Sequence, residues 1–202
     1  MKSVLRQLLF LALTGMFLTG CLLKRTTDST RHFVLTPIPV DESAPAPSRH
    51  WSIGLGSVRM PSQLLRDSLV VRNGANEIEY LENALWAERL DHGFERILAA
   101  NLSRLLSTDA IYPEGWGRGQ VMARVSVNVQ QFEVDTGGSG TLVAQWRITA
   151  PENDRPLKSG LAQLSRTGAS PRAKPEVIAT TLSDLAADFS RDLAQSIRES
   201  LP

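Results

Sequence analysis

Residues 121–130 read VMARVSVNVQ, and this stretch decides the fold class because an apolar side chain recurs at every second position, with mostly polar side chains between. Alternation with a period of two is typical of a strand that has one buried face and one exposed face. Residues 142–148 alternate in the same way after a glycine-rich turn at 137–140, and a third strand is expected around 159–164. Strands joined in this order by short turns predict an antiparallel meander.

Two other stretches have the three-and-four spacing of amphipathic helices. The first runs from about Trp86 and ends before Thr108, and its apolar residues are Leu90, Phe94, Ile97, Leu98, Leu102 and Leu105. The second opens at Pro175, a residue favoured at the first helical position, and its apolar residues are Ile178, Leu182, Leu185, Phe189, Leu193 and Ile197. Because each helix and the sheet have one apolar face, we expect an α+β two-layer sandwich, with an antiparallel sheet and both helices on one face.

The remaining elements are shorter. Residues 32–35 predict a brief strand, and a strand that begins at Trp51 changes its alternation near Gly56, which predicts a bulge. Asn73-Gly74 favours a hairpin because these residues readily take positive φ angles. No second apolar core is left over, so residues 32–202 are expected to form a single α+β domain.

The first twenty residues have the pattern of a secretory leader. Two basic residues precede the apolar run 8–18, which is too short to cross a hydrocarbon layer of about 30 Å. The run ends in Leu18-Thr19-Gly20-Cys21, which resembles the bacterial lipobox, so cleavage would leave Cys21 as a lipidated N-terminus. A permanent transmembrane helix, and an unmodified Cys21 after a plain leader, are the alternatives.

Residues 21–31 are polar and rich in threonine, which predicts a lipidated N-terminus followed by a short tether. Two or more acyl chains hold a protein firmly to a bilayer, whereas a single chain binds marginally. An Asp after the cysteine is the usual signal for retention in the inner membrane, and here Leu22 stands in that position. Resemblance to lipoprotein sorting therefore favours the periplasmic face of the outer membrane.

Composition excludes several classes of protein. The chain has 22 Lys and Arg against 21 Asp and Glu, so no overall field attracts it to nucleic acid. Its single cysteine excludes an internal disulfide and every multi-cysteine metal site. His32, His50 and His92 lack the spacing of a metal site, so no metal and no cofactor is expected.

A set of acid, base and nucleophile is also missing, which predicts a noncatalytic protein. A cell-wall or glycan hydrolase that uses Glu88 or Asp91 is the enzymatic alternative.

Four residues are candidates for contact with a partner. Arg66 and Arg72 stand on either side of the apolar run 69–71, and Tyr112 and Trp116 belong to a loop that contains glycines. Arginine and aromatic side chains are enriched in protein interfaces. The alternatives are solvated strand ends for the two arginines and packing against the sheet for the two aromatic residues.

A series of short motifs follows in a fixed order along the chain. They are His32-Phe33-x-Leu35, Ile53-x-Leu55, Met60-Pro61, Leu64-x-Arg66, Val70-x-Arg72, Trp86-Ala87-Glu88-x-Leu90, Val125-x-Val127-x-Val129, Phe132, Leu142-x-Ala144-x-Trp146 and Leu182-x-x-Leu185-Ala186. Together with the lipobox they resemble the ABC-type transport auxiliary lipoproteins, the PqiC-like proteins that accompany MCE (mammalian cell entry) lipid-transport tunnels. Arg89 stands where proline is common in that family, and two tyrosines usual before Leu35 are absent.

The resemblance implies a lipoprotein of the outer membrane that docks onto a periplasmic tube of MCE-domain subunits. The other end of that tube meets an inner-membrane permease and ATPase, which would supply the energy. Because the tube is ring-shaped, a homo-oligomeric ring of this chain is a further expectation. The alternative function is a periplasmic lipid-binding carrier that holds an acyl chain between its sheet and its helices.

Overall fold

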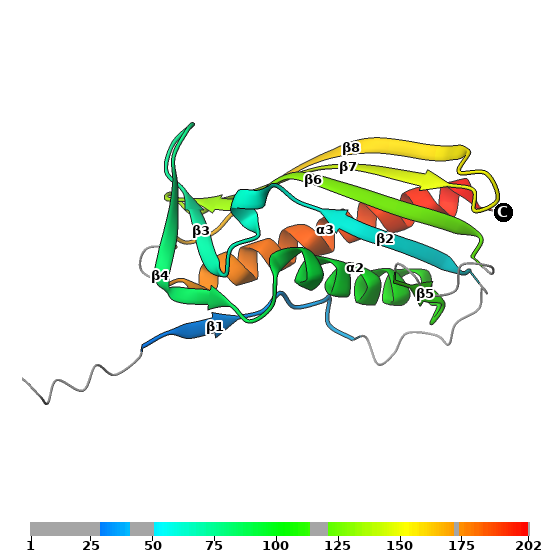
Figure 1. Cartoon of the computed structure of the whole chain (residues 1–202). Helices are drawn as coiled ribbons and strands as arrows, with labels where there is room; N and C mark the ends of the chain where they lie inside the picture. The colour runs from blue at the N-terminus through cyan, green and yellow to red at the C-terminus, as the bar shows by residue number, and fades with distance from the viewer. Residues whose placement is uncertain (1–28, 41–50, 114–120, 172–173, 202) are drawn as a thin grey trace, which may run out of the picture.

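The structure is a computed structural model that describes residues 29–40, 51–113, 121–171 and 174–201. The elements are β1 (Arg31–Phe33), β2 (Ile53–Arg59), the 3-10 helix η1 (Ser62–Leu64), β3 (Ser68–Arg72), β4 (Ile78–Trp86), α2 (Leu90–Leu106), β5 (Ile111–Tyr112), β6 (Ala123–Asp135), β7 (Ser139–Thr149), β8 (Pro156–Thr167) and α3 (Glu176–Ser200). In the described residues an open sheet of eight strands packs on two helices, so the α+β class is confirmed (Figure 1).

The meander is the longest part of the sheet. Strands β6, β7 and β8 pair antiparallel, with Val127 opposite Trp146 and Trp146 opposite Gly160. The glycine-rich turn between β6 and β7 contains Gly138 at a φ of +94°. The period-two alternation therefore predicted the strands, and the short turns predicted their order of pairing.

The sheet as a whole is mixed rather than antiparallel. Strand β6 pairs in parallel with β2 and, further along, with β3, while β1 runs parallel to β4 and β5 runs parallel to β2. Turn signals identify only antiparallel neighbours, because parallel partners need long connections. The expectation of an antiparallel sheet is thus corrected outside the meander and the β3–β4 hairpin.

The two short features predicted from glycine are present. Strands β3 and β4 form an antiparallel hairpin, and Gly74 in its loop has a φ of +79°. The pairing of β2 with β6 shifts register between Leu55 and Val58, which confirms the bulge. Trp86 is the last residue of β4 and α2 begins at Leu90, so the first helix starts later than its apolar spacing predicted.

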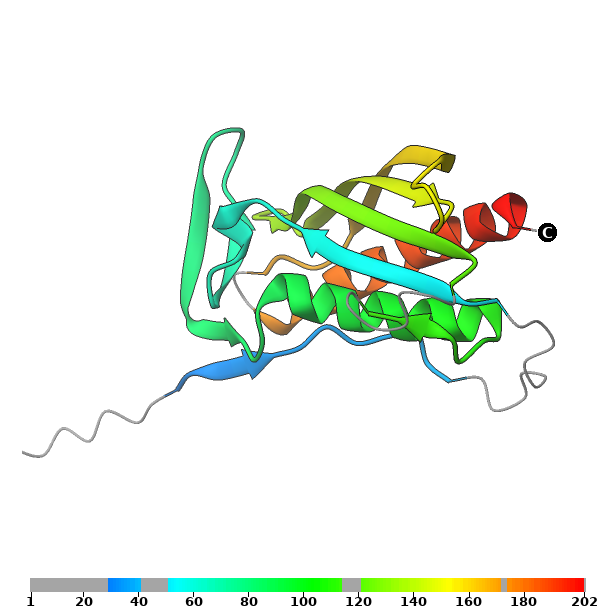
Figure 2. The same ribbon diagram turned by 45° about the vertical axis from the view of Figure 1, so that its right-hand side comes forward.

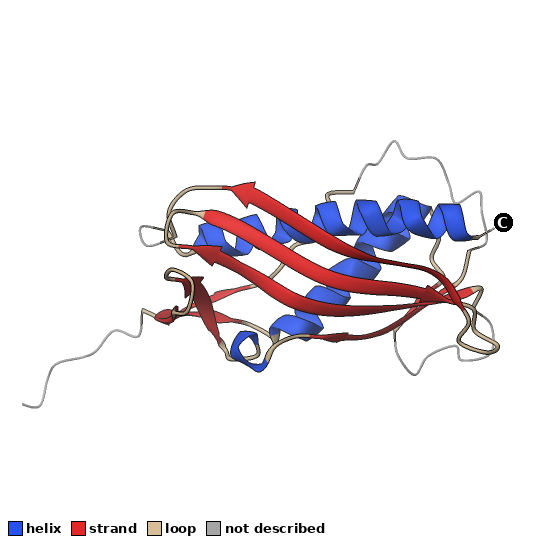
Figure 3. Ribbon diagram, turned by 90° about the horizontal axis from the view of Figure 1, so that it is seen from above, coloured by secondary structure: helices blue, strands red, loops and turns tan. Residues whose placement is uncertain are grey.

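Both helices pack on the same face of the sheet, as predicted, with α3 against β6, β7 and β8 and α2 against β2 and β5 (Figures 1 and 3). Three phenylalanine rings meet between the two layers, with Phe94 of α2 5.1 Å from Phe132 of β6 and 6.0 Å from Phe189 of α3. Each of the three is at most 1% exposed. Side chains therefore fill the centre of the space between sheet and helices.

After β1 the chain continues as an extended segment, residues 34–38, which we term the strap. The strap crosses the side of the two helices that faces away from the sheet (Figures 1 and 2). Leu35, in its middle, is 2% exposed and joins the apolar core. Sheet, helices and strap thus form three successive layers.

Candidate partner-binding surfaces

Arg72 ends β3 and is bound within the chain. Its Nε donates to Oε1 of Glu133 in β6, and its Nη1 donates to the carbonyl oxygen of Ala75 at 3.1 Å. The Glu133 side chain is 3% exposed and also accepts a hydrogen bond from Gln131 at 3.0 Å. Because a buried carboxylate needs a cation nearby, Arg72 fastens the β3–β4 hairpin to β6. A contact between Arg72 and a partner stays a prediction.

Arg66 lies just before β3 and has an exposed side chain. Its guanidinium carbon is 4.7 Å from the centre of the Tyr80 ring, a cation–π arrangement. The Tyr80 hydroxyl in turn donates to the carbonyl oxygen of Gln63 at 3.2 Å. Arg66 therefore keeps its charge at the surface, and its role toward a partner stays a prediction.

Tyr112 lies far from these two arginines. It is half-buried in β5, opposite Gly54 of β2, and Gly54 is opposite Arg124 of β6. Strand β5 and the β3–β4 hairpin are at opposite ends of the sheet (Figures 1 and 2), so the structure does not bring Tyr112 together with Arg66 and Arg72. Trp116, Cys21 and the leader lie outside the described residues.

The residues considered for catalysis are held in ion pairs. Glu88 accepts hydrogen bonds from Arg96 at 2.6 and 3.0 Å, and Asp91 accepts from Arg89 at 2.8 and 3.2 Å. Across the described ranges, no three His, Cys, Asp or Glu side chains are arranged to hold a metal ion. His50 lies outside those ranges.

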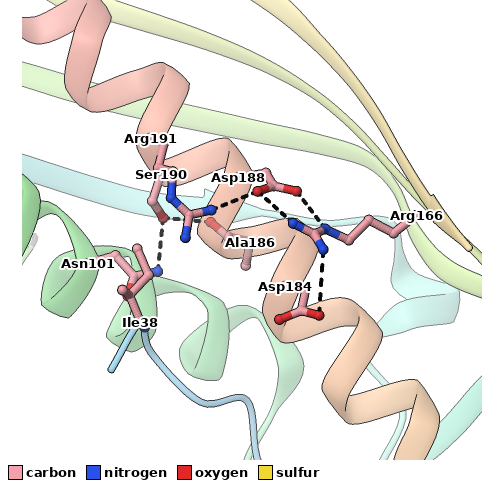
Figure 4. Close-up of polar contacts among 8 residues, drawn as sticks. All are labelled: Ile38, Asn101, Arg166, Asp184, Ala186, Asp188, Ser190 and Arg191. Atoms are coloured by element: carbon pink, nitrogen blue, oxygen red, sulfur yellow. Dashed lines mark hydrogen bonds and ion pairs between the residues drawn. The ribbon is translucent and has the colours of Figure 1, made fainter. Parts of the chain in front are cut away.

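The strap is held by side chains from both helices. Oδ1 of Asn101 accepts from the backbone N–H of Ile38 at 2.8 Å, and its Nδ2 donates to Oγ of Ser190 at 3.1 Å (Figure 4). Oγ of Ser183 accepts from the N–H of Thr36 at 3.0 Å. These residues of α2 and α3 are buried, and their polar atoms are satisfied by the strap, by each other and by carbonyl groups of α3.

The carbonyl groups of the strap are bound as well. Arg96 donates to the carbonyl oxygen of Leu35 at 2.9 Å, and Arg104 donates to that of Ile38. Hydrogen bonds thus hold both the N–H and the C=O groups of the strap, as a neighbouring strand would in a sheet. The strap closes the helix side of the protein.

A charged network lies beside the strap on α3. Arg166 of β8 donates to both carboxylate oxygens of Asp188, at 2.7 and 3.0 Å, and lies 3.8 Å from Asp184 (Figure 4). Arg191 donates to Asp188 at 2.7 Å. The hydrogen bonds from Arg166, aided by the positive charges of Arg166 and Arg191, hold the pKa of Asp188 below its ordinary value.

A depression of about 280 Å³ adjoins this network at the start of α3. Its charged lining residues are Arg166, Asp184 and Glu176, and Glu176 accepts a hydrogen bond from Arg31 at 3.0 Å. These charges neutralise one another, so the described lining residues offer no unpaired charge to a ligand.

Three arginines that the sequence analysis does not single out lie on the outer face of the sheet, which is turned away from the helices. Arg147 of β7 is opposite Ser126, and Arg59 of β2 is opposite Asn128, so the two arginines flank β6. Both side chains are exposed, and neither guanidinium group has a hydrogen bond or ion pair with any part of the chain that the structure describes. The Arg124 side chain forms an ion pair at 3.3 Å with Asp154, which is 76% exposed.

No helix in the described parts of the chain combines the length and the apolar character that crossing a bilayer requires.

Solved structures share this fold. Protein XCC0632 from Xanthomonas campestris, described as a DUF330 protein, matches with a TM-score of 0.68 at 14% identity, over 82% of this chain and 93% of that one. An uncharacterized protein matches with a TM-score of 0.66 at 19% identity, over 83% of this chain and 98% of that one. At such low identity the likeness concerns the fold alone. No curated protein sequence matches this chain significantly.

A family model matches residues 33–194, and its description is the ABC-type transport auxiliary lipoprotein component. The matched range begins at the last residue of β1 and ends within α3, so it includes the strap, strands β2 to β8, all of α2 and most of α3. The chain belongs to the ABC-type transport auxiliary lipoprotein family.

Proposed function

We propose that this chain is a noncatalytic accessory subunit of an MCE/ABC-type system that moves phospholipid between membranes and so supports the integrity of the cell envelope. The observation that carries the proposal is the family match over residues 33–194. The chain supplies no energy of its own, so the ABC-type permease and ATPase of the system would do so.

The anchor would be Cys21, modified with acyl chains after the leader is removed, and the membrane would be the outer membrane. Residues 21–31 would then supply the lipidated N-terminus and the tether, which leads into β1 at Arg31. About ten extended residues span at most about 35 Å, which keeps the domain close to the bilayer. The strap continues from β1 and fixes the end of this tether to both helices.

The partner would be the tube formed by MCE-domain subunits, whose end the folded domain contacts. A ring of copies around that end is part of the proposal, because a cyclic tube presents the same contact to each copy.

The packing of the interior supports an accessory role over a lipid carrier. An acyl chain between sheet and helices would occupy the place of Phe94, Phe132 and Phe189, which are nearly inaccessible to solvent. Opening that space would remove the ring contacts at 5.1 and 6.0 Å. Native mass spectrometry separates the two functions, because a carrier would retain a lipid and the accessory subunit would give a bare protein mass.

Affinity capture of the lipidated protein from envelope extract in mild detergent tests the proposal. The expected result is recovery of an MCE-domain subunit together with its permease and ATPase. Repeated absence of any MCE-domain subunit, with the captured protein folded and abundant, would contradict the proposal.

The anchor needs its own test, because capture in detergent does not depend on it. Cys21→Ala should move the protein from the outer-membrane fraction to the soluble periplasmic fraction, since the acyl chains supply the membrane affinity. Sedimentation of Cys21→Ala with the outer membrane would show that something else holds the protein there.

A further inference from the structure

The sheet and α3 have opposite charges. Strands β2, β6, β7 and β8 together contain five basic and two acidic residues, whereas α3 contains five acidic and two basic residues. Both acidic residues of the strands are engaged within the chain, since Glu133 binds Arg72 and Asp135 accepts from the N–H of Ser139 at 2.8 Å. The positive charge of the sheet is therefore not cancelled by carboxylates on its own strands.

The unpaired part of that charge lies on the outer face. Lys158 and Arg166 of β8 point to the helix side, where they bind Glu199 and Asp188. Arg59 and Arg147 point outward on either side of β6, at positions that strand geometry places about 12 Å apart. Two exposed guanidinium groups on rigid strands, with no partner in the described chain, are available for an external anion.

The side chains around these arginines are neutral. Residues that lie opposite one another on neighbouring strands form rows across the sheet. The row that contains Arg59 of β2 continues through Asn128 of β6 and Gln145 of β7 to Leu161 of β8. In the next row, Arg147 of β7 lies between Ser126 of β6 and Ser159 of β8. Leu161 is 53% exposed, and Tyr112 lies at the end of the row that contains Arg124. Arginine, an aromatic ring and neutral hydrogen-bonding groups without a free carboxylate are the composition of a protein interface.

The outer face also points away from the side of the molecule that carries β1 and the strap (Figures 1 and 3). The strap and β1 lie beyond the helices, and Figure 3 looks directly onto the strands with no described element over them. A tether that leaves from β1 would bring the helix side toward the bilayer more readily than the sheet. An occupant of the outer face is therefore a protein in the periplasm rather than the membrane surface.

We infer that the outer face of β2, β6, β7 and β8 is the docking surface for an acidic surface of the MCE-domain tube, with Arg59, Arg124 and Arg147 as its charged contacts. The inference rests on the proposed function and adds to it the face and the residues that meet the partner. Tyr112 contributes at the margin of this surface, whereas Arg72 does not, because its charge is neutralised by Glu133.

Binding of the full lipidated chain in detergent to the purified MCE-domain subunit from the same organism tests the inference. The charge reversal Arg59→Glu with Arg147→Glu should weaken binding by at least about tenfold, because like charges would then face each other. The matched control compares two single reversals that change the net charge equally: Arg147→Glu should weaken binding, whereas Lys174→Glu, at an exposed position just before α3, should leave the affinity within about twofold. Equal melting temperatures of the variants would show that all remain folded.

Each outcome decides a different point. If the unaltered chain binds and the Arg59/Arg147 reversal binds equally well, the docking surface is wrong and the proposed function stands. If the unaltered chain does not bind the MCE-domain subunit, both are wrong. If the reversal changes only self-association in sedimentation, or only binding to phosphatidylglycerol vesicles, the face belongs to a second copy or to lipid, and the inference is overturned.

Discussion

The helix side and the outer face of the sheet both carry polar side chains, but these side chains have different surroundings. On the helix side Asn101, Ser183 and Ser190 are buried and bound to the strap or to each other. On the outer face Arg59 and Arg147 are exposed and have no partner in the described chain. We infer that the buried polar groups of the helix side stabilise the fold and that the outer face binds a partner. Substitutions on the helix side should therefore lower stability, and substitutions of Arg59 or Arg147 should weaken binding without lowering stability.

The largest effect on stability is expected at Arg72, which neutralises the buried Glu133. Arg72→Ala should lower the free energy of unfolding by about 3 kcal/mol, because Glu133 would stay buried without its cation. Arg147→Ala should change it by less than about 0.5 kcal/mol. Denaturant unfolding measures both, and Arg72→Ala with Glu133→Gln should recover part of the loss. Equal changes in the free energy of unfolding for Arg72→Ala and Arg147→Ala would contradict the difference between these two arginines.

The next effect concerns the buried amide beneath the strap. Asn101→Ala should cost about 2 kcal/mol, because the N–H of Ile38 and Oγ of Ser190 both lose a partner. Gln195→Ala, which removes an exposed amide from α3, is the control and should cost less than about 0.5 kcal/mol. Urea unfolding compares the two variants, and a similar cost for both would mean that the strap contributes little.

A smaller effect is expected at the other hydrogen bond to the strap. Ser183→Ala should cost about 1 kcal/mol and speed hydrogen exchange at the amide of Thr36, whose acceptor is Oγ of Ser183. Thr180→Ala is a matched control, because both hydroxyls donate to a carbonyl four residues earlier and only Ser183 reaches the strap. Unchanged exchange at Thr36 in Ser183→Ala would contradict this contact.

The smallest effect depends on pH. Because Arg166 holds the pKa of Asp188 below its unfolded value of about 3.9, the pair stabilises the fold above that pH and loses its contribution as the pH falls through the folded pKa. The difference in unfolding free energy between the unaltered chain and Asp188→Asn should stay below about 1 kcal/mol, since both side chains are partly exposed. It should be constant from about pH 7 to 5 and shrink below about pH 4. Growth of the difference on acidification would contradict the assignment.

Local patterns predicted the elements better than their long-range partners. The alternation in β6 and β7 and the helical spacing in α2 and α3 both reflect which residues are buried. Each of these patterns can be recognised within its own segment of the sequence. Trp86 fits the four-residue spacing to Leu90 and Phe94, so the helical pattern seemed to continue into what is the end of β4. The parallel pairing of β6 with β2 joins segments about seventy residues apart and leaves no local signal.

The surfaces were harder to predict than the fold, because pairing of charges depends on neighbours in space. Arg72 and Arg147 look alike in the sequence, yet Glu133 neutralises one and nothing described neutralises the other. Asn101 and Ser190 interrupt apolar helix faces, and a buried polar residue at such a position could have indicated the strap. Tyr112 was singled out with Arg66 and Arg72, but it lies in the row of Arg124 at the far end of the sheet.

Site-specific photocrosslinking in intact cells tests most directly whether recognition belongs to the outer face. A photoreactive residue at Gln145, between Asn128 and Leu161, should form a crosslink to the MCE-domain subunit, identified with an antibody against that subunit. The same residue at Gln195 on the exposed side of α3 should not. Crosslinks to the MCE-domain subunit from Gln195 and none from Gln145 would contradict the account.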